Sequence, residues 1–295
     1  MLIEQVSHEQ RIHGTTLFPL AVYPVVLTPG PRQEFVNIHW HEEVEFVLVT
    51  KGKVVVQVGA QLFSVVEGEG VFIHSELPHA LMAPEEGGES EFTAIVFDMK
   101  LLSSSMYDLA TSRYVNPLFE HKLYIPTYLS NQTIWETQIL SYTKDIITSF
   151  LDQQSGYEIA IKGYIYLIMA VLAKYDAFMQ NSEMSREDTL KLQQLKRVLS
   201  YIDEHMKHKI TLEDFAALLP MSKGHFCRFF KQMTQKRPMQ YIIDLRINRA
   251  AKLLRETDWS ILEIGLEVGF EDLSYFIKTF RESKNCTPKQ FRTLL

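Results

Sequence analysis

Cysteine is scarce in this chain, with two among 295 residues. Cys227 and Cys286 lack metal-binding spacing, so we expect free thiols and neither a disulfide framework nor a cysteine-ligated zinc site. Long apolar runs are also missing, since the longest, YIYLIMAVLA at 164–173, is about half the length of a membrane-spanning helix. The opening residues, MLIEQVSHEQRIHG, contain no basic start followed by an apolar run. We therefore expect no secretory signal, no membrane partner and a cytoplasmic location.

Basic residues are few in the first two thirds of the chain. Residues 1–195 hold 12 Lys and Arg against 24 Asp and Glu, a net charge of −12, whereas residues 196–295 hold 18 against 12, a net charge of +6. The basic segment favours a module that binds a polyanion, although charge alone is explained equally well by a solvated basic face. With 46% hydrophobic and 22% charged residues, the chain has the composition of a globular protein of about two domains.

The first part of the chain has the pattern of β structure. Short apolar runs rich in Val and Phe, separated by Gly or Pro, cover 20–27, 44–49, 54–58, 71–73 and 92–97. Such strands predict a sandwich or barrel. From Asn131 to Met179 the apolar positions follow helical spacing, and the segment DQQSGYE divides this region into two helices. The second helix is apolar on more than one face, which fits either a dimer interface or burial within one chain.

The last hundred residues contain a repeat. Apolar landmarks recur fifty positions later: Phe226 as Phe276, Phe230 as Phe280 and Pro238 as Pro288. Each copy has the pattern of a helix, a short turn and a second helix, with N-caps expected at Thr211, Ser222 and Asp272. The small residues Ala216 and Gly265 would let the two helices of each copy approach closely, as a helix-turn-helix requires.

The second helix of each copy has one apolar face, which leaves the opposite face for DNA. Such a helix can enter the major groove. The residues that we expect to contact DNA are Ser222, Lys223, His225, Cys227, Arg228, Lys231, Leu273, Ser274, Ile277 and Lys278. Between the copies, residues 238–254 predict a helix of about 26 Å. A helix of this length could hold the two recognition helices roughly one DNA turn apart.

This region resembles the DNA-binding domain of AraC/XylS-type transcription regulators. The stretch LRINRAAKLLRETDWSILEIGLEVGFEDLSYFIKTFRESKNCTPKQFR carries the family's Arg-Ile-x-x-Ala, Val-Gly-Phe, Ser-Tyr-Phe and Thr-Pro landmarks in order. Gln235 and Asn285 stand where the family usually has a helix-ending glycine, and Gly224 stands where relatives often carry a larger residue. The resemblance covers about the last hundred residues. It implies a homodimeric, sequence-specific DNA-binding regulator that acts on RNA polymerase.

The stretch NIHWHEEVEF at 37–46 places two histidines and two glutamates, His39, His41, Glu43 and Glu45, at alternating positions. On one strand they would share a face. With Gly52, this spacing resembles the first motif of the cupin superfamily. HSELPH at 74–79 resembles the second motif, with His79 as the third histidine but no proline at the position of His74.

The cupin resemblance leaves two alternatives open. Three histidines and a carboxylate suit Fe, Mn, Ni or Zn, which would make His39, His41, Glu45 and His79 the ligands of a metal-dependent oxygenase or isomerase. Alternatively, these residues and Glu43 line a polar pocket for a small effector, such as a sugar or another polar metabolite. AraC-type sensor domains resemble cupins and often keep this pattern while acting as receptors.

Together these patterns predict an α+β protein with two functional parts. We expect a cupin-like β-barrel sensor at 1–125, a helical dimerisation element at 126–180, a linker at 181–189 and an all-α double helix-turn-helix domain at 190–295. The expected function is ligand-responsive transcription regulation without catalysis and without a required cofactor, a divalent metal remaining an open alternative. The rivals are a metal-dependent cupin enzyme carrying a DNA-binding domain and a nucleoid-associated binder without an effector. The sequence does not separate an activator from a repressor.

Overall fold

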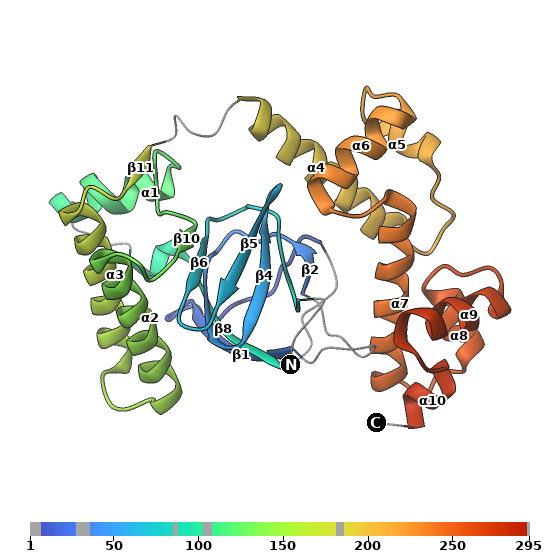
Figure 1. Ribbon diagram of the computed structural model, residues 1–295, viewed down its shortest axis with the longest axis horizontal. Coiled ribbons are helices and arrows are strands. Elements are labelled where there is room, and N and C mark those ends of the chain that lie inside the picture. The colour runs from blue at the N-terminus through green and yellow to red at the C-terminus, as the bar shows by residue number, and fades with distance from the viewer. Residues whose placement is uncertain (1–6, 28–35, 85–87, 103–107, 181–185, 294–295) are drawn as a thin grey trace. The chain divides into compact units, whose positions relative to one another are not determined.

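The computed structural model describes residues 7–27, 36–84, 88–102, 108–180 and 186–293 (Figure 1). The chain forms two compact units. The barrel unit consists of Gln10–Pro29 and Trp40–Thr189, and the helical unit consists of Leu190–Leu295 with the segments Met1–Glu9 and Gly30–His39. Within the described ranges, none of the helices combines the length and hydrophobicity that crossing a lipid bilayer requires.

The barrel unit is built on a five-stranded antiparallel sheet. Its order is β1 (Leu20–Leu27), β8 (Ser90–Phe97), β3 (Val44–Lys51), β6 (Gly70–Ile73) and β10 (Tyr128–Leu129). In the centre of the sheet, Phe46 lies opposite Phe72 on one side and Ile95 on the other. Four of the predicted apolar runs are strands of this sheet.

A second antiparallel arrangement joins β7 (His79–Met82), β4 (Lys53–Val58) and β5 (Gln61–Val66). The fifth predicted run is β4. The sequence did not predict β5 or β7, and β2 (Val36–His39) coincides with the start of the strand predicted at 37–46. Most residues of β5 are exposed, so its side chains lack the apolar alternation that identifies a strand. The short strands β9 (Leu123–Tyr124) and β11 (Met179–Gln180) pair with each other.

Helices cover one face of the five-stranded sheet. α2 (Ile134–Asp152) and α3 (Tyr157–Lys174) lie side by side in Figure 1, and the shorter η1 (Met99–Leu102), η2 (Thr111–Val115) and α1 (Asn116–Phe119) contribute residues to the same core. Their apolar residues form one core with the sheet, including Phe46, Phe72, Ile139, Ile165 and Ile168. The prediction of two helices divided at DQQSGYE is confirmed, because α2 ends at a left-handed Gln153 and α3 begins after Gly156.

Among the described residues, 186–293 form helices joined by short turns. They are α4 (Arg186–His205), α5 (Leu212–Leu218), α6 (Lys223–Thr234), α7 (Pro238–Glu256), α8 (Ile261–Glu267), α9 (Leu273–Lys284) and α10 (Pro288–Thr293). In Figure 1, α5 and α6 lie near the start of α7, whereas α8, α9 and α10 lie near its end. α4 begins inside the segment 181–189 that the sequence predicted as a linker, and residues 181–185 lie outside the described ranges.

The helix ends follow the predicted chemistry. Thr211 and Asp214 form a capping box, and Ser222 and Asp272 accept hydrogen bonds from backbone N–H groups three residues later. The two positions that lack the usual glycine both adopt the left-handed conformation, with φ of 60° at Gln235 and 52° at Asn285. These residues therefore end α6 and α9 as a glycine would, with more strain at glutamine than at asparagine.

Aromatic side chains join the second helix of each copy to the helix that follows it, α6 to α7 and α9 to α10. The ring of Phe230 packs edge-on against Tyr241, and the ring of Phe280 packs in the same way against Phe291. A Cβ atom on Gly265 would lie 3.1 Å from the ring of Phe276, so the glycine permits a close approach of α8 and α9. This geometry agrees with the helix-turn-helix that the sequence predicted.

Candidate DNA interface and effector site

Three polar side chains meet inside the barrel unit, where apolar residues would be the rule. Glu45 Oε2 lies 3.2 Å from His41 Nε2 and 3.1 Å from His79 Nε2. One ligand atom of each of these residues, together with one of His39 at the end of β2, lies within 4.8 Å of the others, and all four residues are buried. The structure thus brings together the four residues that the sequence predicted as metal ligands.

Backbone carbonyls orient the three imidazoles. The Nδ1 atoms of these histidines lie within hydrogen-bond distance of carbonyl oxygens: His39 at 2.9 Å from Asn37, His41 at 3.1 Å from Glu43 and His79 at 2.8 Å from Leu77. Because a carbonyl can only accept, each Nδ1 carries a hydrogen and donates it. In a neutral imidazole the lone pair is then on Nε2, which is the arrangement of many metal-binding histidines.

The contacts of Glu45 require positive charge around it. Lone pairs on His41 Nε2 and His79 Nε2 would repel the carboxylate oxygen. Either protons or a cation must therefore lie between Glu45 Oε2 and these two nitrogens. Burial alone would raise the pKa of Glu45, but the hydrogen bonds and charges of His41 and His79 outweigh it and hold that pKa well below its usual range. The donor set fits Fe, Mn, Ni or Zn, and such a cation would supply a Lewis-acidic point for an oxygen atom of a bound molecule.

Glu43 lies outside this group. The prediction of one continuous strand through 37–46 is wrong, because β2 ends at His39 and β3 begins at Val44 with bends at Glu42 and Glu43. Glu43 Oε2 lies 3.7 Å from His41 Nδ1, the nitrogen on the opposite side of the ring from Glu45. The alternation rule fails here because it applies only while the backbone stays extended.

Further polar residues that were not predicted from the sequence lie near the cluster. His39 Nε2 lies 3.4 Å from Glu9 Oε2, and Glu9 is buried. The ring of His13 lies 5.7 Å from that of His41, and its Nδ1 is 2.9 Å from the hydroxyl of Tyr23. Burial, aided by the charge of His41, lowers the pKa of His13 to about 4. The segment that carries Glu9 and His13 precedes the first strand and has no periodic pattern, so no sequence signal identified these residues.

The recognition helices α6 and α9 each bury one face and expose the other. Phe226, Phe230, Phe276 and Phe280 are fully buried. Of the predicted DNA contacts, two are half-buried, Cys227 and Ile277, and the others are exposed: Ser222, Lys223, His225, Arg228, Lys231, Leu273, Ser274 and Lys278. The predicted residues therefore occupy one outward face on each recognition helix.

Neighbouring charges differ between the two helices. Lys223 is paired with Glu213, and Lys278 Nζ lies 3.9 Å from Glu282 Oε1. Arg281 of α9 and Thr287, which precedes α10, were not predicted, and they line a shallow groove shared with Ser274, Ile277, Lys278 and Glu282. Arg281 follows Ser274 by seven positions and Lys278 by three, a helical spacing that could have identified it.

Comparisons with known proteins match both parts of the chain. The helix-turn-helix domain family matches residues 215–293, and the cupin domain family matches residues 25–96. The HTH-type transcriptional regulator YdeC of Bacillus subtilis (strain 168) is 31% identical, over 99% of this chain and 98% of its own length. This chain belongs to the AraC/XylS-type transcription regulators.

A second relative of this AraC/XylS-type regulator and one solved structure also match nearly the whole chain. The HTH-type transcriptional activator RhaS of Klebsiella pneumoniae (strain 342) is 22% identical over 95% of the chain and 96% of its own length. A crystal structure of apo ToxT from Vibrio cholerae covers 97% of the chain and 100% of its own, at 13% identity and a TM-score of 0.44. The predicted family and α+β fold class are confirmed, and the protein is a ligand-responsive, sequence-specific DNA-binding regulator with DNA and an effector as partners.

Two landmarks of the AraC/XylS-type domain have structural roles. Arg246, which opens the Arg-Ile-x-x-Ala landmark, donates to the carbonyls of Met206 at 3.1 Å and His208 at 2.7 Å. Gly269 of the Val-Gly-Phe landmark has a φ of 91°, and a Cβ there would lie 2.4 Å from the Met206 carbonyl oxygen. These residues therefore join the end of α4 to the second helix-turn-helix and do not lie among the predicted DNA contacts.

Proposed function

We propose that this regulator binds a small polar effector, such as a sugar, at the cluster of His39, His41, Glu45 and His79, and that it performs no catalysis. The support is the buried carboxylate of Glu45 between the imidazoles of His41 and His79 in the barrel unit of a chain whose relatives are named as regulators. A sensor needs reversible binding that differs between two states, which turnover would not provide. The proposal requires no cofactor; if the cluster holds a divalent metal on His39, His41, Glu45 and His79, that metal would be a binding point for the effector.

We propose that the effector changes contacts inside the helical unit. The N-terminal segments pack there against the helices: Ser7 N–H donates to Asp203 of α4 at 2.7 Å, and Asn37 lies 3.5 Å from Asn248 of α7. The same segments carry Glu9 and His39, whose side chains are 3.4 Å apart. Glu9 and His39 therefore belong to the same unit as α4 and α7.

The observation that carries the DNA-binding role is the outward face of α6 and α9 on a basic domain. We propose that the DNA contacts are those predicted from the sequence, that the bound regulator recruits or obstructs RNA polymerase, and that it acts in the cytoplasm, where the DNA is. The proposed division is a sensor at 1–125, a dimerisation element at 126–180, a linker at 181–189 and a DNA-binding domain at 190–295.

We propose that the regulator is a homodimer held by α3. One side of α3 belongs to the core, through Ile161, Ile165 and Ile168. The other side exposes a stripe of small and apolar residues at helical spacing: Ile159, Ala160, Gly163, Leu167 and Ala170. Gly163 and Ala170 would let a second α3 approach closely, and covering Ile159, which is 78% exposed, would remove apolar surface from water.

Leu167→Glu is expected to convert the dimer to a monomer in sedimentation velocity. In a two-fold symmetric dimer the same surface of both subunits forms the interface, so the substitution places one glutamate from each subunit there. Burying these two like charges opposes association. Ser141→Glu, an exposed position on α2, is the matched control and should leave the dimer intact. A dimer that persists in Leu167→Glu at the wild-type dissociation constant would move the interface away from α3.

One pair of measurements tests the proposed function against the cupin enzyme. Selection of bound sequences from a random DNA pool should yield a defined sequence motif. The affinity of the protein for DNA with this motif should change when the effector is present. Metal analysis of the native protein, with activity assays for oxygenase and isomerase reactions, forms the second measurement. Turnover that is lost in His41→Ala would favour the enzyme, whereas a DNA motif without turnover supports the regulator. A protein that binds all DNA sequences alike would support the nucleoid-associated alternative.

A further inference from the structure

The barrel unit contains a second cavity that is separate from the His/Glu cluster. Residues of successive positions on β3 face opposite sides of the sheet. Glu45 is in the cluster, whereas its neighbours Val44 and Phe46 line the cavity. All lining residues lie in the barrel unit, on β3, β6, β8, η1, α1 and α3 and the adjoining loops.

The size of the cavity limits its ligand. Its volume is about 210 Å³. A cavity of about 150 Å³ lined by Leu, Ile and Phe is enough to bind benzene. The cavity therefore has room for a single ring with a short side chain. Its floor is suited to such a ring, since it consists of fully buried apolar side chains, among them Phe46, Phe72, Phe97, Ile165 and Ile168.

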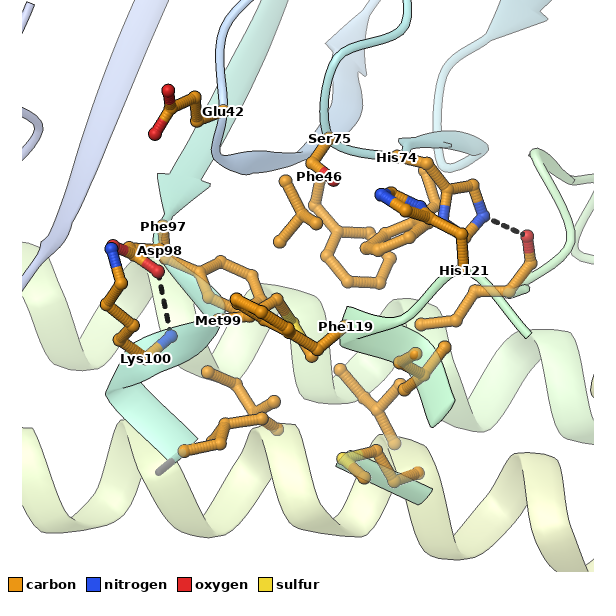
Figure 2. Close-up of a pocket in the computed structure, with 18 of the residues that line it drawn as sticks. Glu42, Phe46, His74, Ser75, Phe97, Asp98, Met99, Lys100, Phe119 and His121 are labelled. Carbon is orange, nitrogen blue, oxygen red and sulfur yellow. Dashed lines mark hydrogen bonds and ion pairs between the residues drawn. The ribbon is translucent and has the colours of Figure 1, made fainter. Parts of the chain in front are cut away.

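The rim of the cavity is acidic. Glu42, Glu76 and Asp98 line it, against a single ammonium group on Lys100. Lys100 Nζ lies 3.1 Å from Asp98 Oδ2, so its charge is already compensated. Figure 2 shows Glu42, Asp98 and Lys100 toward one end, His74 and His121 toward the other, and Phe97 and Phe119 above the helices. This distribution favours a cationic group on the ligand over an anionic one.

His74 adds a neutral hydrogen-bond acceptor. Its Nε2 lies 2.9 Å from the carbonyl oxygen of Ile125, as Figure 2 draws. The carbonyl can only accept, so Nε2 carries the hydrogen and Nδ1 keeps the lone pair. Burial lowers the pKa of His74 to about 4, and the charge of His121 acts in the same direction, so the ring stays neutral near pH 7. An N–H donor on a ligand can therefore bond to Nδ1.

We propose that this cavity binds a small amphipathic amine, with its ring against the floor of Phe46, Phe72 and Ile165 and its ammonium group among the rim carboxylates. The aromatic side chains add attraction for a cation near their faces. Binding itself is independent of DNA. Only an effect of the amine on dimerisation rests on the proposed function. Ile165, Ile168 and Met169 of α3 line the cavity, and the opposite side of α3 carries the residues of the proposed dimer interface.

The test is a titration of the full-length protein without DNA, followed by NMR or calorimetry. Three probes of similar shape differ in their polar group: 2-phenylethylamine, 2-phenylethanol and 3-phenylpropanoate. A ligand of this size is expected to bind with a Kd of about 0.1–1 mM. The amine should bind most tightly and the carboxylate most weakly, with a difference of about fivefold or more between them.

Substitutions in the cavity test whether the probes bind there. Glu42→Gln, at an exposed position that does not endanger the fold, should weaken the amine about three- to fivefold and leave the alcohol unchanged. Glu158→Gln, an exposed glutamate of α3 outside the cavity, is the control and should change neither. Ser75→Trp should block all three probes by filling the cavity.

Several results would overturn the proposal. The first is the absence of saturable binding at amine concentrations about ten times the expected Kd. The second is a carboxylate probe that binds as tightly as the amine. The third is a ratio of amine to alcohol dissociation constants that is unchanged in Glu42→Gln. Sedimentation velocity with and without the amine then tests separately whether amine binding changes the dimer proposed at α3. Amine binding without a change in the dimer leaves the cavity assignment standing and removes its link to dimerisation.

Discussion

Glu45→Gln is expected to abolish the effector response and to lower the free energy of unfolding by about 3–5 kcal/mol. Glutamine has the same shape as glutamate but no charge, so it cannot balance protons on His41 Nε2 and His79 Nε2, which both contact Glu45 Oε2. The substitution leaves two buried imidazoles without their anion. Urea denaturation would measure the stability, and metal titration of the folded variant would show a loss of affinity if the cluster holds a cation.

Glu43→Gln is the matched control for this experiment. Its carboxylate is two positions away in the chain and lies 3.7 Å from the other nitrogen of His41, with partial exposure to solvent. Its loss should change the stability by less than about 1 kcal/mol. DNA affinity in the absence of effector should be close to wild type in both variants. Equal losses of stability in Glu43→Gln and Glu45→Gln would contradict the assignment of Glu45 as the centre of the cluster.

Arg228→Ala is expected to relax the preference for one base pair of the half-site read by α6. Arg228 is exposed, two positions after the buried Phe226, so its side chain points away from the core of the first copy. An arginine that makes two hydrogen bonds to guanine contributes about 1–3 kcal/mol of discrimination. Gly224 offers no side chain, and Lys223 is paired with Glu213, which increases the share of Arg228 in base recognition. Competition binding against a panel of single-base variants measures the effect.

Lys278→Ala provides the comparison, because Lys278 is the equivalent residue of the second copy. Lysine is a point charge that suits phosphate, so its loss should weaken binding to all sequences and reduce the salt dependence by about one phosphate contact. Ser274 could read a base edge, and Leu273 or Ile277 could contact a thymine methyl group on the same helix. If Arg228→Ala weakens specific and random DNA equally, Arg228 contacts only the backbone.

Local chemistry made much of the helical unit predictable from the sequence. The fifty-residue repeat located both helix-turn-helix copies, and Thr211, Ser222 and Asp272 marked helix starts through the capping bonds that the structure contains. Such bonds join residues three positions apart, so the sequence alone carries the information. The spacing of His39, His41 and Glu45 likewise identified a cluster, and His79 completed it through a family resemblance.

Features that depend on distant segments were not predictable in the same way. The break between β2 and β3 places Glu43 apart from Glu45, although their spacing in the sequence suggests a shared face. Glu9 and His13 reach the cluster from a segment without apolar periodicity. The second cavity is assembled from several strands and helices, and no pattern in any one of them reveals it. His74 belongs to that cavity and not to the cluster, although it lies in the same motif as His79.

The continuous helix α7 restricts which arrangements of DNA the protein can recognise. Its 19 residues, from Pro238 to Glu256, correspond to about 28 Å of rod. Inserting one residue into this rod would move the second motif by about 1.5 Å and turn it by about 100° relative to the first. Inserting one base pair between the two recognised segments would shift them by about 3.4 Å and turn them by about 35°. No single insertion in the protein can compensate for one in the DNA, so the distance between the two recognised segments must stay constant while their base sequences are free to diverge.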